Sequence, residues 1–166
     1  MSNILNKNDI SIIIVLDNIR SLNNIGSIFR TSDAFNVDKI ILCGICGKPP
    51  HREINKTALG ATDFVKWCYY SDIKTPITKL ISKGYEIISV EQTNKSIDLK
   101  KYKPKNKVAY IFGNEVKGIS DKTLDLSNFH IEIPQYGNKK SMNVTVCTGI
   151  VLWDFTIKKG PKKGPF

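Results

Sequence analysis

The sequence has no long hydrophobic run, and this absence excludes several classes of protein. The longest apolar stretch, residues 10–16, has the length of one buried strand, far below the roughly 18 residues of a membrane span. Lys7 and Asp9 interrupt the beginning of the chain, and no small-residue cleavage site follows the apolar stretch, so we predict no signal peptide. We therefore expect a cytoplasmic protein that does not associate with membranes.

Cysteine and histidine are also scarce, which argues against a metal centre. The chain has 4 cysteines and 2 histidines. Cys43 and Cys46 form a CxxC pair that His51 follows, but no second pair completes a set of four ligands. Residues 51–53 match the first half of the His-x-Glu signature of zinc deaminases, yet the only CxxC lies upstream of it instead of downstream. We predict that the protein binds no metal.

Acidic residues are outnumbered by basic ones. Asp and Glu number 15 against 25 Lys and Arg, and the formal net charge is +10. Such an excess favours binding to polyphosphates through the release of counterions. Residues 158–166 carry part of it and are expected to form a basic flexible tail. A Lys-rich surface that serves only solubility is the alternative; we favour nucleic-acid binding.

Strand-like and helix-like segments alternate along the chain. Strands are expected at 11–16, 39–42, 66–70, 85–90, 108–112 and 129–133, and helices at 24–35, at 75–84, from Ser120 and at 141–157. Residues 43–54 and 98–107 are expected to be a loop and a basic connector. This alternation predicts an α/β fold, a mostly parallel sheet flanked by helices, in a single domain over residues 1–157.

Ligands of parallel α/β sheets bind where the strands end and loops begin, and three such loops are rich in Gly, Asn and charge. In the first loop, Asn24 is of a residue type that commonly caps helices, and Gly26 indicates the close approach of a backbone or ligand. Arg30 follows one to two turns later. Taken alone, Arg30 is interpreted as an ordinary surface or ion-paired residue.

The second loop, residues 113–118, places two glycines around Glu115. Glycines at a strand end expose backbone groups to a flat ligand such as adenine, although an ordinary tight turn has the same composition. No Lys-Ser or Lys-Thr follows, as a Walker A loop requires, and no Gly-x-Gly-x-x-Gly follows the first strand. A dinucleotide-dependent oxidoreductase is therefore disfavoured. In the third loop, residues 133–145, Ser141 is a plausible helix cap, whereas Asn143 has a weaker structural explanation.

Together the three loops resemble the signature motifs of the SPOUT superfamily, specifically of the TrmH-type tRNA/rRNA ribose 2′-O-methyltransferases. The motifs here are NNIGSIFRT, IFGNEVKGI and an IP pair followed by SMNVTV, and the similarity runs from about Val15 to Asp154. The resemblance implies a C-terminal trefoil knot over residues 108–157 and S-adenosylmethionine as the cofactor. It also implies an obligate homodimer in which each cofactor site lies near motif-one residues of the partner.

The resemblance also assigns residues to the site. It implies that Arg30 is the catalytic arginine and that Asn24, Glu115, Ser141 and Asn143 are polar active-site residues. The residues implied to hold the cofactor, largely through main-chain groups, are Val90, Gly113, Asn114, Gly118, Ile133, Pro134, Ser141 and Met142.

Methyl transfer is an in-line displacement that needs no metal, so the protein must align the ribose oxygen and help to remove its proton. None of the three loops contains a histidine, and free arginine is a poor base because its pKa exceeds about 12. The resemblance implies that Arg30 acts as the base, assisted by an RNA phosphate. Alternatively, Arg30 orients the phosphate and the proton leaves after transfer. Glu115 is expected to position Arg30 or the dimer partner, and Asn24 and Asn143 to hold the ribose or shape the loops.

The predicted substrate is RNA, with tRNA favoured. Many members that act on ribosomal RNA carry an extra N-terminal RNA-binding domain, whereas about ten residues precede the first strand here. An RNA-binding protein with an inactive knot is the alternative. Retention of all five polar residues argues against it, because a pure binder would not need them.

Overall fold

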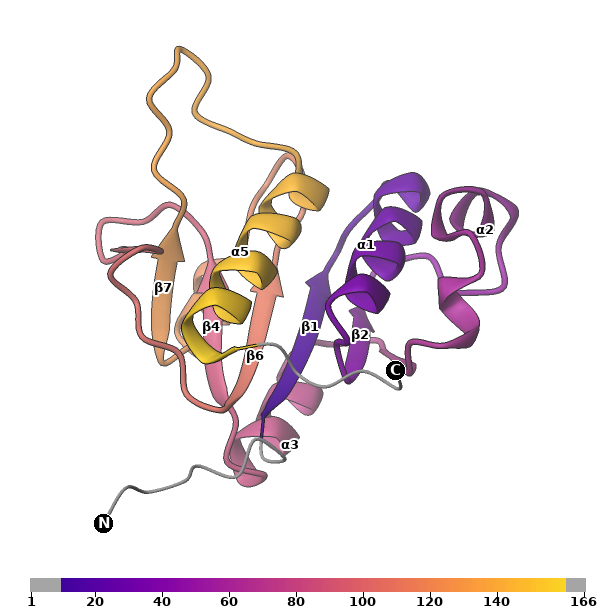
Figure 1. The fold of residues 1–166 in the computed structure, drawn as a ribbon, viewed down its shortest axis with the longest axis horizontal. Coiled ribbons are helices and arrows are strands. Elements are labelled where there is room, and N and C mark those ends of the chain that lie inside the picture. Colours follow the sequence, from indigo (N-terminus) through magenta and orange to yellow (C-terminus); the bar gives the residue numbers. More distant parts are fainter. Residues whose placement is uncertain (1–9, 161–166) are drawn as a thin grey trace.

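The computed structural model describes residues 10–160, and within them the strands form one parallel sheet (Figure 1). The strand order is β3-β2-β1-β6-β4-β7-β5, and every pairing between these strands is parallel. The strands are β1 (Ser11–Asp17), β2 (Lys39–Cys43), β3 (Trp67–Tyr70), β4 (Glu86–Val90), β5 (Ile97–Asp98), β6 (Lys107–Phe112) and β7 (Phe129–Glu132). The predicted α/β fold with a parallel sheet is confirmed; the two-residue strand β5 was missed.

Helices cover both faces of the sheet. They are α1 (Leu22–Ala34), α2 (Arg52–Ala58), α3 (Lys74–Ser82), α4 (Asp121–Leu124) and α5 (Val144–Lys159), with a short 3₁₀ turn at Ala61–Asp63. Helices α1 and α5 lie side by side on one face (Figure 1). The buried core beneath them includes Phe29 of α1 and Phe155 of α5, whereas Ile77 and Leu80 of α3 pack on the other face. These layers fix the strand ends, and hence the loops that follow them.

Residues 43–54 were predicted to form a loop, which is wrong at its end because helix α2, which was not predicted, begins within it. The helix begins at Arg52, and the His51 ring caps it by accepting a hydrogen bond from the Glu53 amide at 3.2 Å. Only Ile54 and Ala58 of the helix are buried, so its sequence lacks the apolar periodicity of a longer amphipathic helix. A Cβ on Gly26 would overlap the backbone of α2, so the close approach predicted at Gly26 is that of a neighbouring helix.

The caps of the two long helices differ from the prediction. Helix α1 is capped by Ser21, whose hydroxyl accepts from the Asn24 amide at 3.2 Å. Helix α5 is capped by Asn143 instead of Ser141, and the Asn143 side chain accepts from the Thr145 amide at 2.8 Å. A capping oxygen must belong to the residue just before the helix, and both helices begin at other residues than predicted. Asn143 therefore has a structural role that the sequence did not suggest.

Helix α3 begins at Lys74, one residue before the start predicted at residue 75. Thr75 lies inside the helix and donates to the Asp72 carboxylate from its amide at 2.8 Å and from its hydroxyl at 2.9 Å. These bonds hold the pKa of Asp72 below its usual range. The N-cap residue Ile73 has no capping side chain, so the Asp72 carboxylate, one residue further upstream, accepts from the first turn of the helix instead.

The C-terminal helix extends beyond residue 157, into the segment predicted as a tail. Lys158 belongs to α5, and its ammonium donates to the Leu99 carbonyl at 2.6 Å and to the Tyr102 carbonyl at 2.7 Å. It also pairs with Asp154 at 2.7 Å. The end of α5 is thereby attached to the connector between β5 and β6. The rest of the predicted tail, residues 161–166, lies outside the described residues. Among residues 10–160, no helix has the length and apolarity needed to cross a bilayer.

Candidate active site

A cavity of about 470 Å³ opens at the carboxyl ends of β4, β6 and β7, which are neighbours in the sheet. Its volume lies within the range of small-molecule sites. Ten of the predicted site residues line it: Asn24, Val90, Gly113, Asn114, Glu115, Gly118, Ile133, Ser141, Met142 and Asn143. Residues from three distant loops therefore converge on one cavity.

The loop that contains Gly113 and Gly118 is a tight turn packed against itself. A Cβ on Gly113 would lie 2.6 Å from the Gly118 carbonyl carbon and 2.6 Å from the Ile119 amide nitrogen. Gly118 has a φ of 67° and donates its amide to the Asn114 carbonyl at 2.8 Å. Both glycines are needed for the turn itself, and the turn presents main chain to the cavity.

Asn114 organises this turn from within. Its side-chain oxygen accepts from the amides of Val116 at 3.0 Å and Lys117 at 2.9 Å. Its side-chain nitrogen donates to the Asn18 carbonyl, just after β1, at 2.8 Å. The amide group of Asn114 therefore fixes the shape of the loop and ties it to the end of β1.

Glu115 binds the beginning of α1. Its carboxylate accepts from the backbone amides of Arg20 and Ser21, each at 3.1 Å, and from the Asn24 side chain at 3.2 Å. Burial alone would raise the pKa of Glu115, but hydrogen bonds from its own amide and from these three partners hold it below its usual range. Glu115 is therefore an ionised anchor of α1. Its hydrogen-bond partners within this chain do not include Arg30, and the expectation that it positions Arg30 or the dimer partner stays a prediction.

Three carboxylates give the cavity an acidic lining. Besides Glu115, they are Glu91 and Glu132, which were not predicted, and they outnumber the basic residue of the lining, Lys140. Glu91 accepts from the Ile119 amide at 3.0 Å, and Glu132 accepts from the Ser96 hydroxyl at 2.7 Å. Both stand at or just after the carboxyl end of a strand, so the rule that ligands bind at strand ends would have found them. Such a lining favours a cationic ligand.

Two predicted residues lie outside this cavity. Pro134 does not line it, although its neighbours Ile133 and Gln135 do. Arg30 is exposed on α1 and is absent from the cavity lining. Within one chain, the structure therefore does not bring Arg30 together with Gly113 and Asn143.

Neither histidine lines the cavity. His51 caps α2, and the ring of His130 lies between the Thr93 hydroxyl and the Leu124 carbonyl, at 3.1 Å from each. The described residues therefore supply no imidazole to act as a base there.

The CxxC cysteines are buried in the core. Cys46 sulfur accepts from the Ile19 amide at 3.2 Å and donates to the Leu16 carbonyl at 3.4 Å. Burial raises the pKa of Cys46 to about 11 and also raises that of Cys43, so both are neutral thiols. In residues 10–160, no three His, Cys, Asp or Glu side chains gather in a way that could hold a metal ion.

Comparison with known proteins agrees with this arrangement. Residues 11–153 match the profile of the SpoU rRNA Methylase family. A tRNA (guanosine(18)-2'-O)-methyltransferase of Aquifex aeolicus is 27% identical over 154 residues, which are 91% of this chain and 71% of the relative. An uncharacterized tRNA/rRNA methyltransferase of Borreliella burgdorferi is 32% identical over 148 residues, 89% of this chain and 64% of the relative. The chain thus spans about two thirds of the length of these relatives.

The fold has close counterparts among solved structures. The SpoU methyltransferase AviRb from Streptomyces viridochromogenes, solved in complex with the cofactor AdoMet, superposes with a TM-score of 0.83 at 17% identity, over 90% of this chain and 58% of that one. The chain belongs to the SpoU methylase family. This membership confirms the resemblance predicted from the motifs, and the enzyme class and cofactor predicted with it are those of the family.

Proposed function

We propose that the protein transfers a methyl group from S-adenosylmethionine to a ribose 2′-hydroxyl of RNA, with tRNA as the substrate. The convergence of three motif loops on one acidic cavity carries this proposal. Membership of the SpoU family supports it, as does the name of the Aquifex relative, a 2′-O-methyltransferase of tRNA. An RNA substrate is in turn consistent with the expected cytoplasmic location.

The volume of the cavity and the charge of its lining suit the proposed cofactor. The turn at residues 113–118 presents main-chain groups to a flat base, and the carboxylates of Glu91, Glu115 and Glu132 favour a ligand that carries positive charge. When bound, S-adenosylmethionine supplies a methyl group activated by a positively charged sulfur. We assign the main chain around Gly113, Ile133 and Met142 to holding it.

The chain's own residues would then align the ribose and assist loss of its proton. Asn24 and Asn143 line the cavity near its polar rim, as does the exposed Ser141. The side-chain oxygens of Glu115 and Asn143 already accept hydrogen bonds within the chain, so their part is to hold loops in position. Arg30 is left to contact the RNA phosphate, either to favour loss of the hydroxyl proton or to stabilise charge.

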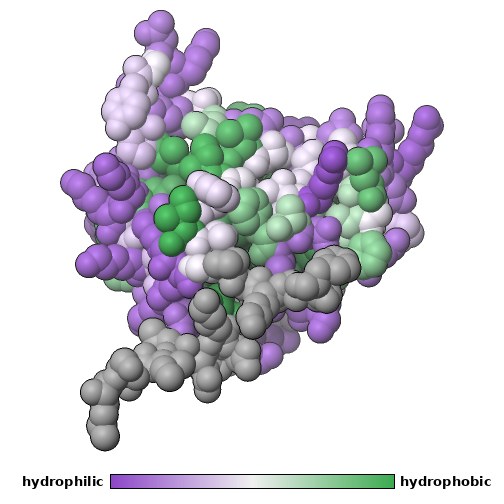
Figure 2. All heavy atoms as spheres, viewed as in Figure 1, coloured by the Kyte–Doolittle hydropathy of each residue, from purple (hydrophilic) through white to green (hydrophobic). Residues whose placement is uncertain are grey.

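We propose further that the enzyme is a homodimer paired through α5 and α1. Val146, Ile150, Trp153 and Ile157 recur at the spacing of one helix face. Three of them are well exposed, with Val146 at 49%, Trp153 at 59% and Ile157 at 65%. Figure 2 shows apolar side chains gathered over α5. Because α1 lies beside α5, a twofold pairing there would bring Arg30 of the partner subunit toward the cavity.

The implied trefoil knot is also part of the proposal. Strand β6 lies between β1 and β4, although β1 and β4 precede it in the chain. Helix α5, which follows β7, then returns to the connector before β6 and contacts Leu99 and Tyr102 through Lys158. This return of α5 to an earlier connector supports the proposal that the C-terminal half of the chain is threaded through itself.

Methylation of total RNA tests the function. Purified protein is incubated with unmodified total RNA and radiolabelled S-adenosylmethionine, and the product is digested to nucleosides. We expect label in a 2′-O-methylated nucleoside of the tRNA fraction. Label in a base would contradict the ribose assignment, and label in ribosomal RNA would contradict the choice of tRNA. An absence of label together with an absence of cofactor binding would favour an RNA-binding protein with an inactive knot.

A further inference from the structure

The loop between β7 and α5 extends well beyond the cavity that it helps to form. Gln135 and Lys140, on the two sides of the loop, line the cavity, whereas the tip between them rises above the strand ends (Figure 1). Tyr136 on this tip is 95% exposed. No backbone hydrogen bond ties residues 134–141 to another described residue. The loop therefore presents an aromatic ring to solvent beside the proposed reaction site.

An aromatic ring with this exposure has no role in packing its own chain. A tyrosine ring is large and apolar on both faces, and it gains free energy only when something covers it. The other strongly exposed aromatic residues lie elsewhere, Trp153 on α5 and Phe64 just after the 3₁₀ turn. Tyr136 is thus separate from the apolar face proposed for the dimer.

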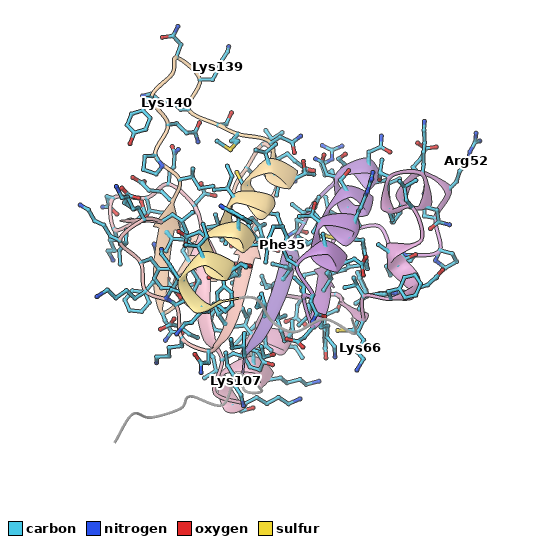
Figure 3. All side chains as sticks on the ribbon, in the orientation of Figure 1. Phe35, Arg52, Lys66, Lys107, Lys139 and Lys140 are labelled. Carbon is cyan, nitrogen blue, oxygen red and sulfur yellow. The ribbon has the colours of Figure 1, made fainter. Side chains whose placement is uncertain are left out.

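The charge around the loop indicates what covers the ring. Glu91, Glu115 and Glu132 outnumber Lys140 among the charged residues that line the cavity, so the cavity disfavours phosphates and an RNA backbone is better neutralised outside it. Lys139 and Lys140 stand on the same loop as Tyr136. The Lys139 side chain points away from the body of the protein (Figure 3), whereas Lys140 lines the cavity. An exposed aromatic ring next to lysines is the arrangement by which proteins bind unpaired nucleotides, with a base on the ring and phosphates on the ammonium groups.

We propose that Tyr136 stacks on an unpaired base next to the target ribose, while Lys139 contacts the adjoining phosphate. This inference rests on the proposed function and deepens it: the substrate nucleotide lies in a loop or single-stranded segment. Tyr136 would be a positioning residue, because it holds the RNA over the cavity without touching the reacting atoms. One stacked base contributes about ten- to hundred-fold in affinity.

The test compares Tyr136→Ala with Tyr136→Phe in the full chain. We measure the affinity for an unmodified tRNA transcript by fluorescence anisotropy, the affinity for S-adenosylmethionine by calorimetry, and the KM and kcat of methyl transfer. We expect Tyr136→Ala to raise the RNA Kd and KM about ten- to hundred-fold and to leave cofactor affinity unchanged. Tyr136→Phe should retain wild-type affinity, because stacking needs the ring and not the hydroxyl. Phe64→Ala, which removes another exposed ring, is the matched control and should change nothing.

The outcomes separate this inference from the proposed function. If the wild type binds tRNA but transfers no methyl group, the proposed function fails, and the RNA Kd values of the two variants still decide the role of Tyr136. Unchanged RNA affinity in Tyr136→Ala would overturn stacking. Equal losses in the Ala and Phe variants would also overturn it, by showing that the hydroxyl or the loop conformation matters. Dissociation of a dimer by Tyr136→Ala would identify the ring as a contact with a second copy.

Discussion

At the scale of single residues, the polar side chains of the site differ in whether they bind groups of their own chain. Glu115 and Asn143 are engaged by backbone amides of their own chain. The Arg30 side chain is exposed on α1 and makes no hydrogen bond or ion pair to another described residue. An arginine that is exposed and keeps its five donors available is suited to a phosphate brought by a substrate.

Arg30→Ala should therefore abolish methyl transfer while leaving cofactor affinity nearly intact. The expectation follows because Arg30 lies outside the cavity that we assign to the cofactor. Transfer is measured with radiolabelled S-adenosylmethionine and affinity by calorimetry. Arg52→Ala, which removes an exposed arginine from α2, serves as the control for a general loss of positive charge. Equal loss of transfer and affinity in Arg30→Ala would show that the residue is structural.

Glu115→Gln should destabilise the protein in a manner that depends on pH. The variant keeps the size of the side chain but weakens its bonds to two backbone amides, which costs about 1 kcal/mol at a partly exposed position. The native pKa of Glu115 lies below its ordinary value of 4.5. Its contribution is therefore complete above that value and is lost as pH falls through the native pKa. Urea unfolding of both proteins from pH 7 downward measures this. A difference that grows toward acid pH would contradict the assignment.

At the scale of elements, apolar runs predicted most strands, because strands of a parallel sheet are buried on both faces. Strand β1 is such a case, with six consecutive buried residues. The same reasoning missed α2, of which only two residues are buried, and it misplaced the caps. Ser21 and Asn143 were overlooked because neighbouring residues have equally suitable side chains, and backbone conformation decides which of them caps.

Gly26→Ala should destabilise the contact between α1 and α2. A methyl group there would overlap the Ile54 carbonyl and the Thr57 hydroxyl, and forced overpacking costs about 1–3 kcal/mol. This cost exceeds the helix propensity that alanine gains over glycine, about 1 kcal/mol. Ser27→Ala, one residue along the same helix, is the control and should be neutral or slightly stabilising. Chemical denaturation of the three proteins compares them, and a stabilised Gly26→Ala would refute the close packing.

At the scale of the whole molecule, the sequence predicted which loops meet at the cavity. Residue patterns alone did not predict that Arg30 lies outside the cavity of its own chain. Ten predicted residues line the cavity because motif residues at strand ends must lie at one edge of a parallel sheet. In the proposed homodimer, the position of Arg30 relative to the cavity would depend on packing between chains, which the order of residues in one chain does not specify. The acidic lining was missed for a different reason: Glu91 and Glu132 belong to strand ends outside the motifs.

Trp153→Glu should convert the enzyme to monomers of 18.7 kDa and abolish transfer. The carboxylate would be buried against an apolar partner surface, at a cost that a homodimer contact does not offset. Phe64→Glu, at a ring exposed elsewhere, is the control. Sedimentation measures the mass. Asn143→Ala should also impair transfer, because it removes the cap that holds the loop before α5. Where Arg30→Ala and Asn143→Ala chains are each inactive alone, an equal mixture should recover about a quarter of wild-type activity, because half of randomly paired dimers then contain one intact site. No recovery would place Arg30 in the site of its own chain.

The contact made by Lys158 differs from those available to exposed lysines, and the two kinds of lysine should respond differently to ionic strength. The Lys158 ammonium is sheltered and held by two carbonyls and a carboxylate, whereas lysines such as Lys139 reach into solvent. Dissolved ions screen exposed charges strongly and sheltered pairs much less. Concentrated salt should consequently remove bound nucleic acid from the surface while the last turn of α5 remains attached to the connector between β5 and β6. The protein should therefore be freed of RNA without loss of its fold.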